Sequence, residues 1–295
     1  MARSGHIRNP FEIALEQFSS AVSDAGDAAV RPRERAAVTV PTVRRITRED
    51  LWASLREGAG DAAAVRDDIL FIGVIYPLAG LILARFLFSQ NLIPLAFPLV
   101  AGFALVGPVA AVGLYEISRR REAGEAVSWT SAFKVLRSPA LPSILWLGFL
   151  MLVLFGMWMA TAWGIFYATL GPQFMTPIGA APPSLRAFLD AVLLTPQGWA
   201  MTVTGLVVGF LFAAFAMAVS VISFPLLLDR PDIGVTAAVR TSLKAVAANP
   251  SVMALWGLVV AGLLLLGSIP ALFGLIFIVP MLGHATWRLY RRVIE

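Results

Sequence analysis

The residues of this sequence that combine charge, hydrogen-bonding capacity and aromatic character gather at the edges of its apolar runs. Asp229 and Arg230 end one long apolar run, and a polar stretch leads from there to Pro250. Opposite charges partly withdrawn from water need partners, and a short helix over 233–248 can bring Arg240 back toward Asp229. We therefore predict one candidate cluster on a single face of the protein, made of Asp229, Arg230, Asp232, Arg240, Asn249, His284, Trp287 and Tyr290.

Two interpretations of this cluster stay open. It is either a latch that holds a surface helix to a helix bundle or a docking site for a lipid headgroup or a protein partner. Asn249 can cap the end of the short helix while Pro250 starts the next one. Trp287 and Tyr290 have the amphipathic rings that are typical of a membrane interface.

Residue types that carry catalysis are scarce. The chain has no cysteine, which excludes disulfides, thiolate metal sites and cysteine nucleophiles. It contains no G-x-x-x-x-G-K-[ST], H-E-x-x-H or G-x-S-x-G motif. His284 is the single histidine in an apolar run, the other being His6, and a haem–copper centre needs several. We predict no catalytic, cofactor-binding or metal-binding residue, no cofactor, and a protein that is not an enzyme.

The elements that must position the cluster are apolar helices. The chain is 58% hydrophobic and 14% charged, whereas soluble domains carry about 25% charged residues. Runs of about 20 apolar residues match a bilayer core of ~30 Å, and a backbone in lipid must satisfy its own hydrogen bonds. The predicted fold is all-α, a polytopic membrane helix bundle with six transmembrane helices.

The apolar runs divide the chain into three parts. Residues 1–42 are predicted to be soluble and largely flexible, 43–68 to hold a cytoplasmic helix that leads into the first span, and 69–295 to form the membrane domain. A capping box at Thr47–Asp50 opens that first helix, and Gly58 is its expected stop. The six spans are predicted at about 69–88, 92–115, 142–170, 199–228, 252–266 and 269–287.

The basic residues predict the orientation. All but two of the 23 lysine and arginine residues fall on one side when both termini lie inside, as the positive-inside rule requires. The exceptions are Arg85, which is close enough to the end of its span to snorkel, and Arg186. The chain is therefore predicted to span a membrane several times with both termini cytoplasmic.

Short amphipathic segments separate several spans. Interfacial helices are expected near 128–138 and 233–248 in the inner loops, with Asp232 as the N-cap of the second. Thr130 and Thr241 each stand nine residues before a proline, which suggests a parallel repeat, although two independent linkers explain the spacing equally simply. In the outer loop, Ser184 is the expected N-cap of a further surface helix.

Three stretches carry a resemblance to a known family. They are RITREDL at 45–51 leading into IGVIY at 72–76, the segment FPLLLDRPDIGVTAAVRTSLKAVAANP at 224–250, and PMLGHATWRLYR at 280–291. Over about residues 43–292 the chain resembles a bacterial family of six-span inner-membrane proteins described as a domain of unknown function. Some members carry a cytochrome c oxidase subunit I-like label, which the histidine count of this chain contradicts. The resemblance implies a fold and a location but no activity, ligand or site residue.

The function expected from these observations is an organising, assembly or lipid-interacting role without catalysis. The expected partners are the lipid bilayer and other membrane proteins or lipids, with no nucleic acid, since the basic residues sit at membrane edges. A permease for a small apolar or lipid-like molecule is the alternative, because the charge-free runs at 138–185, 191–228 and 245–287 argue against an ion-coupled carrier. A redox or haem protein fits the sequence least.

Overall fold

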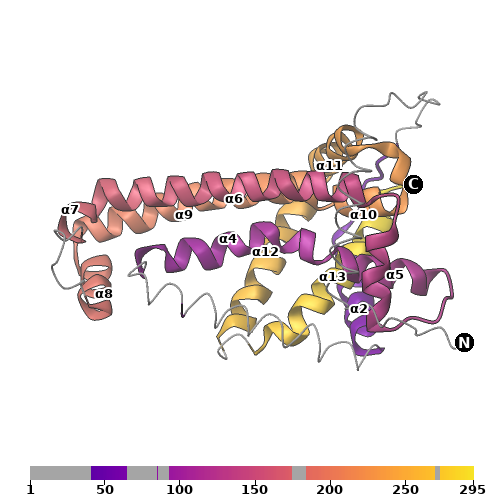
Figure 1. Ribbon diagram of the computed structural model, residues 1–295, viewed down its shortest axis with the longest axis horizontal. Helices are drawn as coiled ribbons and strands as arrows, with labels where there is room; N and C mark the ends of the chain where they lie inside the picture. The colour runs from indigo at the N-terminus through magenta and orange to yellow at the C-terminus, as the bar shows by residue number, and fades with distance from the viewer. Residues whose placement is uncertain (1–40, 65–84, 86–92, 175–183, 270–272) are drawn as a thin grey trace, which may run out of the picture.

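The computed structural model describes residues 41–64, 85, 93–174, 184–269 and 273–295, and within these ranges every named element is a helix (Figure 1). An isolated antiparallel bridge joins Val43 to Ile294. The all-α prediction is confirmed for these residues. Nearly all of the predicted flexible region 1–42 lies outside the described residues, and so does the predicted first span 69–88 apart from Arg85. Arg85 is helical and exposed.

Two long helices run side by side along the length of the molecule, α6 (Leu141–Thr169) and α9 (Pro196–Ser220) (Figure 1). Each begins with a proline in its first turn, where the missing N–H would have no helical partner. At one end the chain passes through α7 (Gly171–Phe174) and α8 (Leu185–Leu194). The predicted cap of α8 is confirmed, because the Ser184 hydroxyl accepts from the backbone N–H of Ala187 at 3.2 Å.

A third apolar helix, α4 (Ala96–Ala110), lies beside this pair and follows the short helix η1 (Ile93–Leu95). A turn at Ala111 separates it from α5 (Val112–Glu122), so the second predicted span is two helices and not one continuous span over 92–115. Pro108 falls inside α4, where a proline removes one helical hydrogen bond. The polar residues of α5 then begin at Glu116.

Beyond α9, the chain continues through α10 (Ser223–Asp229), η3 (Pro231–Ile233) and α11 (Val235–Ala248). The helix expected over 233–248 is therefore present. Its N-cap is Gly234 and not Asp232, since the chain turns there with a φ of +74°, a left-handed conformation that glycine adopts without strain. The inner helix expected near 128–138 is η2, a 3₁₀-helix over Trp129–Arg137.

The last two helices are α12 (Pro250–Ser268) and α13 (Leu275–Val293). The first contains the whole of the fifth predicted span. The second starts later and ends later than the predicted 269–287, because its C-terminal half is amphipathic and packs on protein instead of ending at a membrane edge.

The N-terminal helix α2 (Arg48–Ala64) crosses α13 at close range. The predicted capping box is confirmed: the Asp50 carboxylate accepts from the Thr47 N–H at 2.9 Å and the Asp50 N–H donates to the Thr47 hydroxyl at 3.3 Å. Gly58 is not the stop of this helix. It lies in the middle of α2, and a Cβ at Gly58 would be 2.5 Å from the Ala285 backbone nitrogen, so its role is close packing.

Three helices in the described part of the chain are long and apolar enough to cross a membrane. They are Leu141–Thr169, Pro196–Asp229 and Pro250–Ser268. Six transmembrane helices are not confirmed. The main core lies away from most of the length of the long helices, where α5, α10 and α13 meet, and its largest fully buried side chains include Trp287, Tyr290 and Phe224.

Candidate functional site

The C-terminal half of α13 carries most of the polar contacts at this end of the molecule. The Tyr290 hydroxyl donates to the Asp229 carboxylate at 2.7 Å, so the end of α10 is tied to α13. Arg291 joins the same carboxylate at 3.4 Å and reaches Glu122 of α5 at 3.0 Å. The indole N–H of Trp287 donates to Glu122 at 3.0 Å. Three helices therefore converge on two carboxylates.

Burial and the neighbouring carboxylate both act on Tyr290. The side chain is 1% exposed, and desolvation followed by the charge and hydrogen bond of Asp229 raises the pKa of Tyr290 well above its usual range. The phenol therefore keeps its proton and donates it to the Asp229 carboxylate in a hydrogen bond, which ties α13 to the end of α10.

A second set of contacts joins α13 to α2. Asp61 is 6% exposed, and it pairs with Arg288 at 2.8 Å and with Arg121 of α5 at 3.4 Å. Its hydrogen bond raises the pKa of Arg288, so that guanidinium stays charged. One turn earlier on α2, Glu57 pairs with Arg292. A buried charge with two partners holds both neighbouring helices in place.

His284 lies between these two sets of contacts. It is 3% exposed, and its Nδ1 is 2.6 Å from the Ser118 hydroxyl of α5. Beside it, Gly283 allows α13 to approach Leu114 of α5, since an added Cβ would be 2.4 Å from a Leu114 methyl carbon. The histidine therefore forms part of a close helix–helix contact.

Asn249 holds a different segment of the chain. Its side-chain oxygen accepts from the Ile46 N–H at 2.8 Å, and its amide donates to the carbonyls of Arg44 and Ala245, both at 3.1 Å. The residue also stands between α11 and α12, as predicted. It is 4% exposed, and its hydrogen bonds to Ile46 and Ala245 are buried, while the one to Arg44 is partly buried.

The two ends of the described chain meet near Arg230. Its guanidinium donates to the Glu295 carbonyl at 2.8 Å, and Thr42 bonds to Glu295 through both main chain and side chain. The Arg44 N–H donates to the Val293 carbonyl at 2.8 Å. Residues 42–46 are thus held between the C-terminus and Asn249.

The structure brings together some of the predicted residues and leaves two apart. Asp229, Trp287 and Tyr290 share one network, while His284, Asn249 and Arg230 each take part in neighbouring contacts. Asp232 and Arg240 are exposed and make no ion pair among the described residues. Asp229 takes Tyr290 and Arg291 as partners where Arg240 was expected.

Several residues of this region were not predicted. They are Ser54, Glu57, Asp61, Ser118, Arg121, Glu122, Arg288, Arg291 and Arg292. A signal was present in the last turns of α13, where Arg288 stands three and four residues before Arg291 and Arg292. Glu57 and Asp61 of α2 also stand four residues apart, and they pair with Arg292 and Arg288. We call the whole set of contacts between α2, α5, α10 and α13 the clamp.

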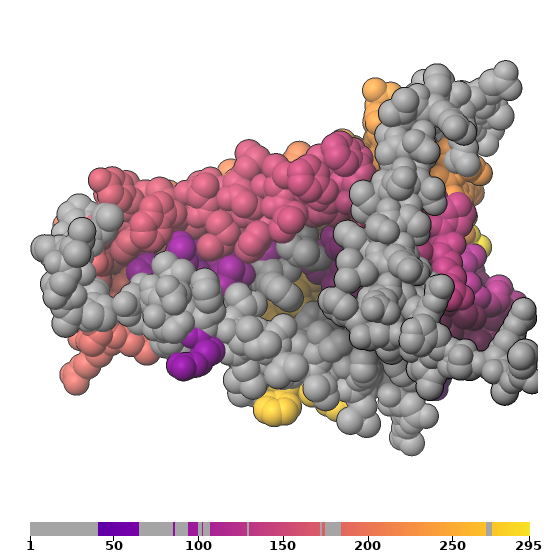
Figure 2. All heavy atoms as spheres, in the orientation of Figure 1, coloured from indigo at the N-terminus to yellow at the C-terminus, as the bar shows by residue number. Residues whose placement is uncertain are grey.

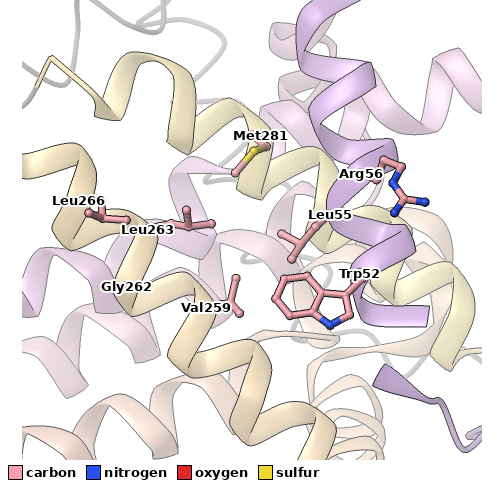
Figure 3. Close-up of a pocket in the computed structure, with 8 residues that line it drawn as sticks. All are labelled: Trp52, Leu55, Arg56, Val259, Gly262, Leu263, Leu266 and Met281. Atoms are coloured by element: carbon pink, nitrogen blue, oxygen red, sulfur yellow. The ribbon is translucent and has the colours of Figure 1, made fainter. Parts of the chain in front are cut away.

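An apolar groove lies on the other side of α2, between α2, α12 and α13 (Figure 3). Its volume is about 620 Å³, within the range of small-molecule sites. The described residues contain no group of three or more metal-ligating side chains. The clamp fixes four helices to one another through its ion pairs and hydrogen bonds, and the groove is a separate apolar hollow.

One comparison with known proteins gives a match. Residues 96–229 match the model of a family described as "Predicted integral membrane protein (DUF2189)". No curated protein matches the chain, and no solved structure matches it. The matched residues run from the start of α4 to Asp229 at the end of α10, and so include Glu122 and Asp229 of the clamp. The resemblance to a membrane family of unknown function is confirmed over residues 96–229, which match the model of that predicted integral membrane protein family.

Proposed function

We propose that this chain is a multi-pass protein of the bacterial inner membrane with an organising, assembly or lipid-interacting role and no catalytic activity. The supporting observation is the division of the molecule into an apolar length and a charged end. Large apolar side chains such as Phe149, Leu152, Phe210 and Leu211 are at least half exposed along α6 and α9. Figure 2 shows the side chains of α6 uncovered along the molecule. Such a surface needs lipid around it.

The orientation that we propose places the clamp in the cytoplasm. Arginines 119–121, 230, 288, 291 and 292 all belong to the clamp or adjoin it, whereas α8 at the far end carries Arg186 and Asp190. The positive-inside rule then puts both termini inside. Six spans remain our proposal, with the first one over 69–88.

Cysteine labelling tests this topology directly, because the chain has no cysteine of its own. In spheroplasts, a membrane-impermeant maleimide should label Asp190→Cys and should not label Glu125→Cys or Thr236→Cys until the membrane is opened. Labelling of residue 125 or 236 from outside would overturn the proposed topology.

The role itself is tested by lipid dependence and by spectroscopy. Added bacterial phospholipid should raise the unfolding temperature of the delipidated protein, because lipid replaces detergent on the exposed faces of α6 and α9. An unchanged unfolding temperature would count against a lipid-interacting role. An optical spectrum with one haem per chain would overturn the proposal in favour of a redox protein.

The apolar groove favours a second candidate function, a permease for a small apolar or lipid-like molecule. Proteoliposomes that contain the chain would then exchange a fluorescent lipid between leaflets faster than protein-free vesicles. Exchange at the protein-free rate would leave the non-transporting role as the better proposal.

A further inference from the structure

The groove between α2, α12 and α13 is apolar except at one place. Its lining from α12 and α13 consists of Val259, Gly262, Leu263, Leu266 and Met281. Three residues of α2 complete the lining, two of them apolar or aromatic and the third Arg56 (Figure 3). A ligand that fits must therefore be apolar over most of its length.

The α12 wall belongs to a helix that faces lipid. Residues 259, 262, 263 and 266 recur at spacings of three and four, so they form one stripe along the helix. α12 is one of the three candidate spans, and Leu266 is 59% exposed. The groove thus opens on the same apolar surface that we assign to the bilayer, and a lipid chain can enter it sideways.

The α2 wall supplies a charge and an indole. Trp52 is 49% exposed and stands one helical turn before Arg56, so the two side chains lie on the same side of α2. Arg56 is exposed and has no ion-pair partner among the residues that the structure describes. Its neighbour Glu57 points to the other side, where it pairs with Arg292. The arginine at the groove is therefore available to an anion.

We propose that this groove binds one acyl chain of an anionic glycerophospholipid whose phosphate contacts Arg56. The chain lies along the stripe of α12, and Trp52 sits at the level of the glycerol backbone, where indole rings are favoured. The inference rests on the proposed function and gives it a ligand class and a site. The complementary charge selects anionic over zwitterionic lipid, because a basic residue near the membrane surface is attracted to anionic headgroups.

The charge is tested with a matched pair of arginine variants. Arg137 is also exposed and without an ion pair among the described residues, and it lies in η2, outside the groove. Native mass spectrometry of the full chain would measure the dissociation constants of phosphatidylglycerol and phosphatidylcholine. Wild type should bind one phosphatidylglycerol about fivefold more tightly than phosphatidylcholine, which is about 1 kcal/mol. Arg56→Gln should abolish this preference and Arg137→Gln should keep it.

The apolar wall is tested with a matched pair of glycines. A Cβ at Gly262 or at Gly205 of α9 would meet nothing within 4 Å, so both positions accept a side chain without a clash. Gly262→Phe should fill the groove and lower phosphatidylglycerol affinity at least tenfold. Gly205→Phe makes the same change outside the groove and should leave the affinity within twofold of wild type.

Three outcomes would overturn the proposal. They are equal binding of the two lipids by wild type, equal effects of Arg56→Gln and Arg137→Gln, and unchanged affinity in Gly262→Phe. Displacement of the lipid by millimolar glycerol phosphate would also overturn it, since that result assigns recognition to the headgroup alone. If lipid still raises the unfolding temperature while these variants bind lipid like wild type, the groove is not the binding site, and the proposed lipid-interacting role stands.

Discussion

The α6–α9 pair and the α2–α13 pair are both helix–helix contacts, but different types of residue form them. α6 and α9 meet through aromatic and small residues, with Trp158 and Ala216 among the few that are fully buried. α2 and α13 meet through a glycine and a set of arginine–carboxylate pairs. The comparison separates two ways of holding helices together in one chain.

The surroundings of each pair explain the difference. In lipid the hydrophobic effect does not drive apolar helices together, so side-chain packing and a few hydrogen bonds must stabilise their association. Trp158 of α6 provides one such bond to the neighbouring apolar helix α4, from its indole N–H to the Pro98 carbonyl at 2.8 Å. At the end of the molecule that we assign to water, charged side chains keep their hydration when they are unpaired, and ion pairs there add specificity to a packed contact.

The α2–α13 pair depends on the close approach of the two helices at Gly58, and preventing this approach should lower stability more than any other change. Gly58→Ala places a Cβ 2.5 Å from the Ala285 backbone nitrogen, so the helices must separate. We expect a loss of about 3 kcal/mol in the free energy of unfolding, at the upper end for overpacking.

Gly60 on the same helix is the control for this change, since a Cβ there would meet nothing within 4 Å. Gly60→Ala should raise stability by about 0.5–1 kcal/mol through helix propensity. Chemical unfolding in one detergent measures both variants, and a similar loss in each would contradict the packing role of Gly58.

The buried carboxylate of Asp61 should have the next largest effect. Asp61→Asn keeps the shape but removes the charge that holds Arg288 and Arg121. Removing one partner of a buried pair costs about 3–5 kcal/mol, and we expect about 2–3 here because the Arg288 side chain is 24% exposed.

The matched change for Asp61 lies at the opposite end of the molecule. Asp190 pairs with Arg186 at 3.9 Å, and its side chain is 60% exposed. Asp190→Asn should change stability by less than about 0.5 kcal/mol, as is usual for surface pairs. If the two variants lost the same amount of stability, burial of Asp61 would not be the reason that its ion pairs stabilise the protein.

The sequence predicted the α6–α9 pair far better than the clamp. A long apolar run specifies a helix by itself, and Leu141–Thr169 agrees with the expected 142–170 within one residue at each end. The expected run 199–228 is present as α9 and α10, which a turn at residues 221–222 separates. The caps at Thr47 and Ser184 were likewise local, because the hydrogen bond joins residues three apart. Local signals of this kind need no knowledge of the fold.

The clamp could not be found in this way, since its partners are far apart in the sequence. Asp61 and Arg288 are 227 residues apart, and nothing near Asp61 marks it as buried. Gly58 was interpreted as a helix stop because a glycine after a polar helix is common there, whereas a glycine that admits another helix looks the same in sequence. Asp229 was correctly expected to need a partner, but the choice between Arg240 and Tyr290 depended on how α13 packs.

Asn249 provides a third test, at the segment that leads into α2. Asn249→Ala removes the partner of the buried Ile46 N–H and of the partly buried Arg44 carbonyl. We expect a loss of about 2 kcal/mol and faster tryptic cleavage after Arg44 or Arg45, because residues 42–46 lose their anchor. Ser268→Ala is the control, since that hydroxyl donates to the Leu264 carbonyl of its own helix, and it should leave the cleavage rate unchanged.

The smallest expected effect tests whether the apolar helices α4, α6 and α9 are held together by the indole hydrogen bond between α6 and α4 or by packing. Trp158→Phe removes the donor to the Pro98 carbonyl and leaves an aromatic ring against Phe212. Hydrogen bonds between membrane helices contribute about 0.6 kcal/mol on average, so we expect a loss of about 1 kcal/mol in the free energy of unfolding, with the smaller ring included.

Trp199→Phe is the matched change. The Trp199 indole also donates to a backbone carbonyl, that of Leu193 at 3.1 Å, but its side chain is 58% exposed. It should cost less than about 0.5 kcal/mol. If Trp158→Phe instead lowered stability as much as Asp61→Asn does, polar ties would dominate in both regions, and the distinction between a packed membrane pair and an ion-paired clamp would fail.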